Sequence, residues 1–203
     1  MIYQGAEAKI LISRFLNRDV IVKKRLHKSY RIQEIDDYLI NYRTKTEAKI
    51  IMDARKNSVP VPIIYDVDLI NGIIIMELIK GERVKDIFDL ISDDKRISIC
   101  ERIGRNIARL HKNNIIHGDI TTSNMIERDD DIFFIDFGLS SYNTEIEAQG
   151  VDLHVLMEAI ESTHSNNSDY FKYVLDSYMA EYGEGSDLVV NKINEIVKRG
   201  RYR

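Results

Sequence analysis

Residues 115–138 carry two carboxylates and an amide at a spacing that suits phosphate chemistry. His117 and Asp119 follow a pair of isoleucines, Asn124 comes next, and Asp136 follows a short apolar run. Phosphoryl transfer depends on positioning and charge neutralisation more than on covalent help from the protein. One carboxylate orients the acceptor, while an amide and a second carboxylate hold magnesium on the phosphates. Carboxylates and an amide at this spacing therefore suit a site that holds phosphate groups and Mg²⁺.

This order of residues resembles the catalytic loop and the metal-binding loop of protein kinases. The resemblance implies that Asp119 orients the acceptor or accepts its proton, and that His117 braces the loop. It also implies that Asn124 and Asp136 ligate magnesium. Each short motif alone is typical of ordinary turns. Their joint occurrence, each after the expected helix or strand, favours the functional interpretation.

A kinase-like fold also requires a lysine on its third strand, and residues 20–23 resemble the Val-Ala-Ile-Lys pattern. Lys23 would reach the α- and β-phosphates, with Lys24 as the alternative in a shifted register. Glu47 is the predicted ion-pair partner from the following helix. The alternative for Glu47 is a capping box with Thr44, in which the glutamate would point back at its own helix end.

The nucleotide is expected to lie between a hinge and an N-terminal loop. An apolar strand followed by a glycine predicts a hinge in which backbone groups of Glu77 and Ile79 meet the adenine. Gly5, Ala6 and Glu7 stand where kinases carry a glycine-rich phosphate loop. Because this loop has a single glycine and an acidic residue, its backbone approaches the phosphates less freely.

Other positions depart from ordinary protein kinases. Gly118 replaces the arginine that pairs with a phosphorylated activation loop, and Thr121 replaces the lysine of Ser/Thr kinases. Between Asp136 and Asp152 there is no Ala-Pro-Glu, so the segment that docks a peptide substrate is missing. Asp152 is either a brace for the catalytic loop or an exposed acid on its helix.

These departures and the motifs around them closely resemble the small kinase of the KEOPS complex, the PRPK or Bud-type family. The motifs that carry this resemblance lie at 4–8, 30–31, 43–48, 117–124, 135–140, 150–153 and 198–203. The resemblance implies a minimal, atypical serine/threonine kinase or ATPase that uses ATP and Mg²⁺. It also implies binding to the Kae-type threonylcarbamoyltransferase subunit and other KEOPS subunits, and work on the threonylcarbamoyl-adenosine modification of transfer RNA.

The elements that would position these residues change character along the chain. Short apolar runs, with Asn71-Gly72 as the signal for a type I′ hairpin turn, predict an antiparallel sheet in the first third. Helices are expected over 36–55 and around 97–110. In the second of these segments apolar residues recur every three or four positions. The remaining predicted elements are a hairpin at 129–131 and helices at 151–162, 169–181 and 186–197.

The predicted fold class is α+β, a minimal bilobal protein-kinase-like fold with a β-rich N-lobe, a helical C-lobe and a shortened activation segment. The chain 1–203 is expected to form a single domain. Its expected parts are an N-lobe at 1–76, a hinge at 77–81, a C-lobe at 82–197 and a basic tail at 198–203.

Composition limits the location and the partners. The chain has 203 residues, 44% of them apolar, and a net charge of −4, so any RNA contact must be local. The single Cys100 excludes an internal disulfide, and the apolar runs are too short to span a bilayer, so a cytoplasmic protein without membrane contact is expected. Lys198, Arg199, Arg201 and Arg203 predict a transfer-RNA contact, with a frayed, solvated terminus as the alternative.

Two other function classes remain open from the residues alone. One is a non-catalytic interaction subunit whose ATP site senses the state of its assembly. The other is a small-molecule kinase of the aminoglycoside or sugar type, which shares the His-x-Asp and asparagine spacing. The Asp-Phe-Gly-Leu-Ser sequence at 136–140 and the short C-terminal part argue against this second class.

Overall fold

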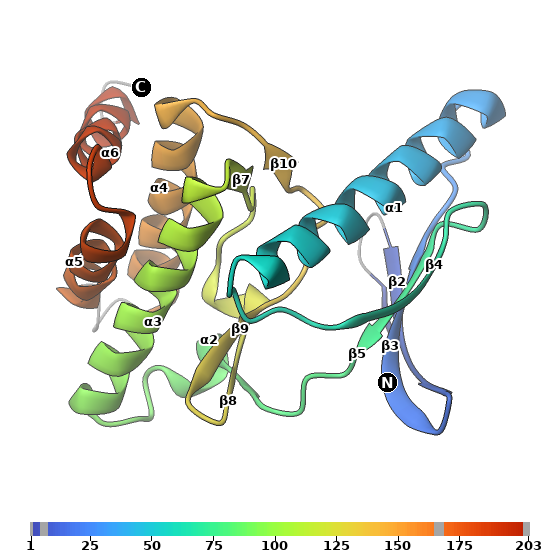
Figure 1. Ribbon diagram of the computed structural model, residues 1–203, viewed down its shortest axis with the longest axis horizontal. Helices are drawn as coiled ribbons and strands as arrows, with labels where there is room; N and C mark the ends of the chain where they lie inside the picture. Colours follow the sequence, from blue (N-terminus) through green and yellow to red (C-terminus); the bar gives the residue numbers. More distant parts are fainter. Residues whose placement is uncertain (1, 5–7, 165–168, 201–203) are drawn as a thin grey trace.

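Strands gather in the N-terminal part of the chain and helices in the C-terminal part, in a computed structural model that describes residues 2–4, 8–164 and 169–200. The two parts form distinct lobes, with the long helix α1 (Gln33–Lys56) lying across the front of the sheet (Figure 1). This arrangement confirms the predicted α+β, two-lobed fold. The division of the chain at residues 76–82 stays a prediction.

The N-terminal sheet has five antiparallel strands in the order β1-β2-β3-β5-β4. Its strands are β1 Ile2–Gln4, β2 Ala8–Phe15, β3 Arg18–Arg25, β4 Ile64–Asp68 and β5 Ile73–Glu77. Leu16 and Asn17 both have positive φ and form the tight turn between β2 and β3.

The type I′ turn predicted at Asn71-Gly72 is wrong. Gly72 has a φ of +65°, but Asn71 is not among the residues with positive φ, and a type I′ turn needs both. The carboxylate of Asp68 accepts from the backbone N–H of Asn71 at 3.0 Å and from its Nδ2 at 2.6 Å. These side-chain contacts hold a longer turn between β4 and β5.

Helix α1 begins at Gln33, well before the predicted start of a capping box at Thr44. Thr44 is buried inside the helix, where its hydroxyl donates to the carbonyl of Ile40 at 2.6 Å. The capping-box alternative for Glu47 is therefore wrong, because Glu47 lies more than three turns into the helix.

The C-terminal lobe combines helices with two small sheets. Its helices are α2 Val84–Ile87, α3 Asp93–Lys112, α4 Ile146–Thr163, α5 Phe171–Tyr182 and α6 Ser186–Gly200, with a 3₁₀ turn, η1, at Thr122–Asn124. Its sheets contain β6 Glu82–Arg83, β8 Met125–Arg128 and β9 Asp131–Phe134 in one, and β7 Ile115–Ile116 with β10 Ser141–Tyr142 in the other. Positive φ at Asp129 and Asp130 confirms the predicted hairpin between β8 and β9.

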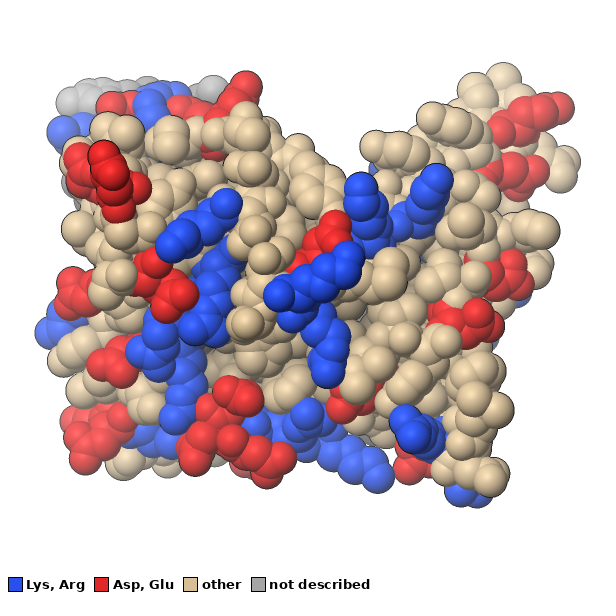
Figure 2. Space-filling model, viewed as in Figure 1, with Lys and Arg blue, Asp and Glu red and all other residues tan. Residues whose placement is uncertain are grey.

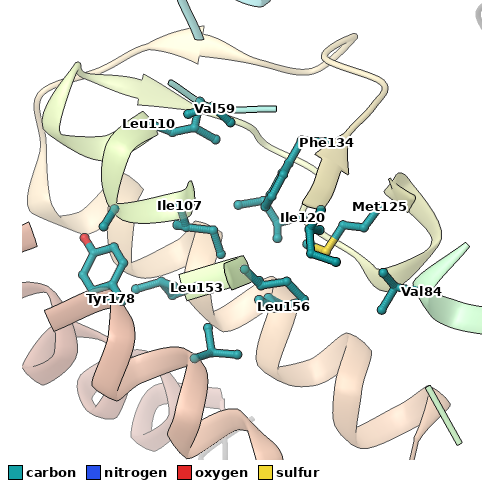
Figure 3. Packing of buried hydrophobic residues seen from close by; sticks show 14 of the residues in the cluster. Val59, Val84, Ile107, Leu110, Ile120, Met125, Phe134, Leu153, Leu156 and Tyr178 are labelled. Carbon is teal, nitrogen blue, oxygen red and sulfur yellow. The ribbon is translucent and has the colours of Figure 1, made fainter. Parts of the chain in front are cut away.

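The main hydrophobic core lies between α3, α4, α5 and the strands of the catalytic region (Figure 3). Val59 and the end of α1, including Ile50 and Ala54, belong to the same core. A smaller cluster in the N-terminal lobe joins Ala48 to Ile74 and other residues of the sheet. Because α1 is packed into both clusters, Glu47 is held at the boundary between the two lobes.

Candidate active site

Lys23 lies in the middle of a cluster of charges that joins the two lobes, between Glu47, which is buried, and Asp136, whose side chain is 44% exposed. Its Nζ donates to Glu47 Oε1 at 2.5 Å and to Asp136 Oδ1 at 2.7 Å. Side chains alternate across a strand, so Lys24 is exposed while Lys23 is only 6% exposed. The structure therefore contains the predicted ion pair, in the register that uses Lys23.

The charges of this cluster shift the ionisation of its members. Burial alone would lower the pKa of Lys23, but the neighbouring carboxylates of Glu47 and Asp136 outweigh it and raise that pKa above its usual value. Burial would conversely raise the pKa of Asp136, yet the ammonium of Lys23 lowers it below its usual range. Both groups are thus charged at neutral pH.

Asn124 and Asp119 are held together at the end of the catalytic loop. Asn124 Nδ2 donates to Asp119 Oδ2 at 2.9 Å and to the Asp119 carbonyl at 3.0 Å. The carbonyl of Asn124 accepts from the backbone N–H of Ile135 at 2.9 Å, which places Asn124 beside the segment that carries Asp136. Because the amide nitrogen of Asn124 is used internally, its oxygen is the atom left for a cation.

The side-chain oxygen atoms of Asn124 and Asp136 fit magnesium. No group of three or more His, Cys, Asp or Glu in the described part of the chain is arranged as a metal cage. Mg²⁺ is usually bound by one or two carboxylates plus phosphate and water oxygens rather than by an all-protein cage. Asp136 and the amide oxygen of Asn124 supply hard oxygen ligands of that kind.

Asp152 braces the start of the catalytic loop from α4. It is 1% exposed, and its carboxylate accepts from the backbone N–H groups of His117 at 2.7 Å and Gly118 at 2.8 Å. His111 Nε2 lies 3.3 Å from the same carboxylate. The prediction of a brace is confirmed, and the alternative of an exposed acid is wrong.

His117 is fully buried beneath the loop. Its ring packs at 4.6 Å from Phe137, and its Nδ1 accepts from the backbone N–H of Asp119 at 3.3 Å. Burial lowers the pKa of His117, because the interior disfavours the imidazolium. The neutral ring therefore joins the catalytic loop to the Asp-Phe-Gly segment without adding a charge.

The segment after Asp136 is short and returns to α1. Its strand β10 pairs with β7, and the hydroxyl of Tyr142 donates to Asp53 Oδ2 at 2.6 Å. Lys49 lies 5.2 Å from the centre of the Tyr142 ring. These contacts connect the segment to the helix that carries Glu47.

The predicted hinge contacts are partly used by the fold itself. The backbone N–H of Glu77 donates to the carbonyl of Ile63 at 2.8 Å, and its carboxylate accepts from Arg128 at 2.9 Å. Any adenine contact at Glu77 would have to use its carbonyl oxygen. Ile79 is 6% exposed, so its side chain is part of the protein interior.

A family model described as "RIO domain" matches residues 8–170. The chain belongs to the RIO-domain family. "KEOPS complex subunit Bud32" of Pyrococcus abyssi is 46% identical over 211 residues, with 100% of this chain and 96% of that protein covered. "Probable serine/threonine-protein kinase BUD32 homolog" of Archaeoglobus fulgidus is 41% identical, with 99% and 95% covered. These matches confirm the resemblance to the Bud-type kinase.

Other relatives of this RIO-domain chain are longer or more distant. "Probable bifunctional tRNA threonylcarbamoyladenosine biosynthesis protein" of Methanobrevibacter smithii is 42% identical over 203 residues, and the chain covers 36% of its length. The solved Rio2 kinase-ADP/Mg²⁺-phosphoaspartate complex from Chaetomium thermophilum has a TM-score of 0.65 at 18% identity, with 98% of this chain and 70% of that chain covered. A solved complex of WaaP with acyl carrier protein gives the same TM-score at 12% identity, with 98% and 87% covered. The match to the Rio2 kinase shows that the chain has a protein-kinase-like fold.

Some predicted positions of the RIO-domain chain lie outside the described residues. These are Gly5, Ala6 and Glu7 of the phosphate loop, and Arg201 and Arg203 of the tail. Lys198 and Arg199 are described, and they belong to the last turn of α6 rather than to a separate tail.

Arg25 is the charged residue of the site that sequence reasoning missed. Its Nη2 donates to Glu47 Oε2 at 2.5 Å, and the side chain is 5% exposed. The signal was available, because Arg25 follows Lys23 by two residues and residues two apart on a strand share a face. Glu47 is therefore shared between two cations.

Proposed function

We propose that this chain is an ATP-dependent phosphotransferase of the atypical serine/threonine type that also hydrolyses ATP. The main support for this proposal is the position of Lys23, whose ammonium bridges Glu47 on α1 and Asp136 on the metal side of the site. A lysine held in this way provides a fixed positive charge for the α- and β-phosphates of ATP.

In this proposal each side chain has a separate task. Asn124 and Asp136 hold Mg²⁺, which would neutralise charge on the phosphates. Asp119 orients the attacking hydroxyl or water and takes its proton. Asp152 and His117 fix the backbone of the loop, so Asp119 keeps its position during the reaction. The carbonyl of Glu77 and backbone groups of Ile79 in the hinge, together with the loop at Gly5 to Glu7, would meet the rest of the nucleotide.

Purified protein with γ-labelled ATP tests this activity. Release of labelled phosphate, or labelling of the protein itself, is expected with Mg²⁺ and is expected to stop when EDTA removes the metal. Returning excess Mg²⁺ should restore it. Turnover that persists in EDTA would contradict the proposal, since the negative charge on the phosphates would then be neutralised without a metal.

We also propose that the chain works as a subunit of the KEOPS complex, in the threonylcarbamoyl-adenosine modification of transfer RNA. The support comes from the Bud32 relative that covers nearly its whole length, and from relatives whose names state that biosynthesis. Affinity capture from the native cell is expected to recover a Kae-type threonylcarbamoyltransferase subunit with other KEOPS subunits. Recovery of none would overturn the assembly but leave the kinase activity untouched.

The proposed contact with transfer RNA is local. Lys and Arg side chains extend across the middle of one face, where acidic side chains lie among and beside them (Figure 2). At the end of α6, Arg199 already pairs with Glu147 at 3.0 Å and with Glu195 at 3.4 Å. A mobility-shift titration tests this contact, because phosphate binding by cations weakens steeply as salt rises. Binding that is absent even at low salt would remove transfer RNA from the proposal.

No described helix is long and apolar enough to cross a membrane.

A further inference from the structure

His164 is a buried histidine at the end of α4, and it joins two segments that are far apart in the sequence. Its side chain has no exposed surface, and its Nδ1 lies 2.9 Å from Asp89 Oδ2. On the other side of the ring, Nε2 lies 3.2 Å from Thr122 Oγ1. Thr122 belongs to the catalytic loop, between the proposed base and the proposed metal ligand.

The carboxylate of Asp89 fixes the direction of these hydrogen bonds. A carboxylate only accepts, so Nδ1 of His164 carries the proton that points at Asp89. In the neutral ring Nε2 is then an acceptor, and the hydroxyl of Thr122 donates to it. The Thr122 hydroxyl is thus held by the His164 ring, and Asp89 on the opposite side of the ring fixes the orientation of that ring.

The segment that carries Asp89 is itself anchored to the C-terminal lobe. Arg96 on α3 donates through Nε to the carbonyl of Phe88 at 2.8 Å and through Nη2 to that of Asp89 at 3.4 Å. The Phe88 ring packs 4.8 Å from the His164 ring. His164 is therefore fixed by packing and by hydrogen bonding from two elements.

Thr122 starts the 3₁₀ turn that presents Asn124. Thr122 is 2% exposed, and the backbone N–H of Asn124 closes this turn on the carbonyl of Thr121 at 3.0 Å. Helix α4 and the residue that follows it therefore hold the catalytic loop at both ends. Asp152 holds the start of the loop through two backbone N–H groups, and His164 contacts the turn at its end.

We propose that His164 is a positioning residue, which acts through the Thr122 hydroxyl to hold the turn that aims Asn124 at the magnesium ion. This inference rests on the proposed function, because that function gives Asn124 its metal. The His164 side chain is fully buried, so it acts on the metal site through Thr122. Its effect is on how well the Asn124 oxygen is placed before Mg²⁺ binds.

A matched pair of variants at Thr122 tests the hydroxyl directly. Thr122→Val keeps the shape of the side chain and removes the hydroxyl, while Thr122→Ser keeps the hydroxyl. The measurement is the Mg²⁺ concentration that gives half-maximal ADP binding in calorimetry. Thr122→Val is expected to raise this concentration about five-fold, the effect of one lost hydrogen bond. This is less than the roughly ten-fold or greater effect of removing a direct partner of a metal ligand. Thr122→Ser should stay within about two-fold of the parent protein.

A purely structural role of the contact gives a different result. Partial unfolding lowers the fraction of molecules that bind ADP, but it leaves the Mg²⁺ midpoint of the folded ones unchanged. An unchanged midpoint in Thr122→Val, or an equal shift in Thr122→Ser, would overturn the inference.

Variants at position 164 keep the test usable if Thr122→Val does not fold. His164→Asn retains a donor for Asp89 but cannot reach Thr122, so it should raise the Mg²⁺ midpoint as Thr122→Val does. His164→Gln extends further and should restore part of the affinity. If neither variant shifts the midpoint, the inference is wrong.

The outcomes also separate this inference from the proposed function. Parent protein that binds Mg²⁺-ADP but never releases phosphate would contradict the proposed catalysis, while the midpoints would still decide the role of His164. Parent protein that binds no nucleotide with Mg²⁺ would overturn both.

Discussion

Asp119→Asn is expected to lower the rate of phosphate release from ATP by about 10²- to 10⁴-fold, the usual contribution of a general base. The substitution keeps the size of the side chain, and its amide oxygen can still accept from Asn124, which now contacts Asp119 Oδ2 at 2.9 Å. What it removes is the negative charge that, in the proposed function, orients and deprotonates the attacking group. ATP affinity should change little, because Lys23 and the metal-side residues are untouched. Single-turnover release of labelled phosphate measures the loss.

Asp131→Asn is a suitable control for this prediction. Asp131 is exposed at the start of β9, outside the site, and the same change of charge there should leave the rate within about two-fold. Equal rates for Asp119→Asn and the parent protein would show that Asp119 is not the base.

The same variant separates catalysis from ATP sensing in the assembled complex. If Asp119→Asn loses phosphate release but leaves transfer-RNA modification intact, while deletion of the protein abolishes it, the ATP site works as a sensor. Loss of both activities together supports a catalytic subunit. This outcome decides between the main proposal and the non-catalytic interaction subunit.

Local patterns were enough to predict the order of the lobes and which residues meet at the site, with Asn124 beside Asp119 and Lys23 beside Asp136. These features follow from spacing in the sequence and from the change from short apolar runs to a helical repeat. The choice between Lys23 and Lys24 stayed open because strand register depends on which face the sheet buries. Only the packing of β3 against its neighbours and α1 resolves it.

Features that depend on distant parts of the chain were not predictable from local patterns. The contact of His164 with Thr122 joins residues 42 positions apart, and its contact with Asp89 spans 75 positions. No short motif encodes such pairs. The turn at Gly72 was mispredicted for a related reason, since the side chain of Asp68 overrides the usual preference of Asn-Gly.

Glu47→Gln is expected to lower the free energy of unfolding by about 3 kcal/mol. Removing one partner of a buried ion pair costs roughly 3–5 kcal/mol, because the remaining charge stays out of water. The lower end applies here, since Lys23 keeps Asp136 beside it at 2.7 Å. Arg25 stays 5% exposed and loses a charged contact of 2.5 Å. Urea denaturation, followed by circular dichroism, measures the change.

Glu34→Gln provides a matched control on the same helix. Glu34 is exposed in the first turn of α1, so its substitution should change the free energy of unfolding by less than about 0.5 kcal/mol. A loss below about 1 kcal/mol in Glu47→Gln would contradict the prediction, and would mean that water reaches the two cations. A buried ion pair is weak evidence for net stability, since well-packed apolar residues often do as well. The physical reason to keep three charges in this interior is therefore placement: Glu47 holds the ammonium of Lys23 beside Asp136, where the phosphates of ATP would lie in the proposed function.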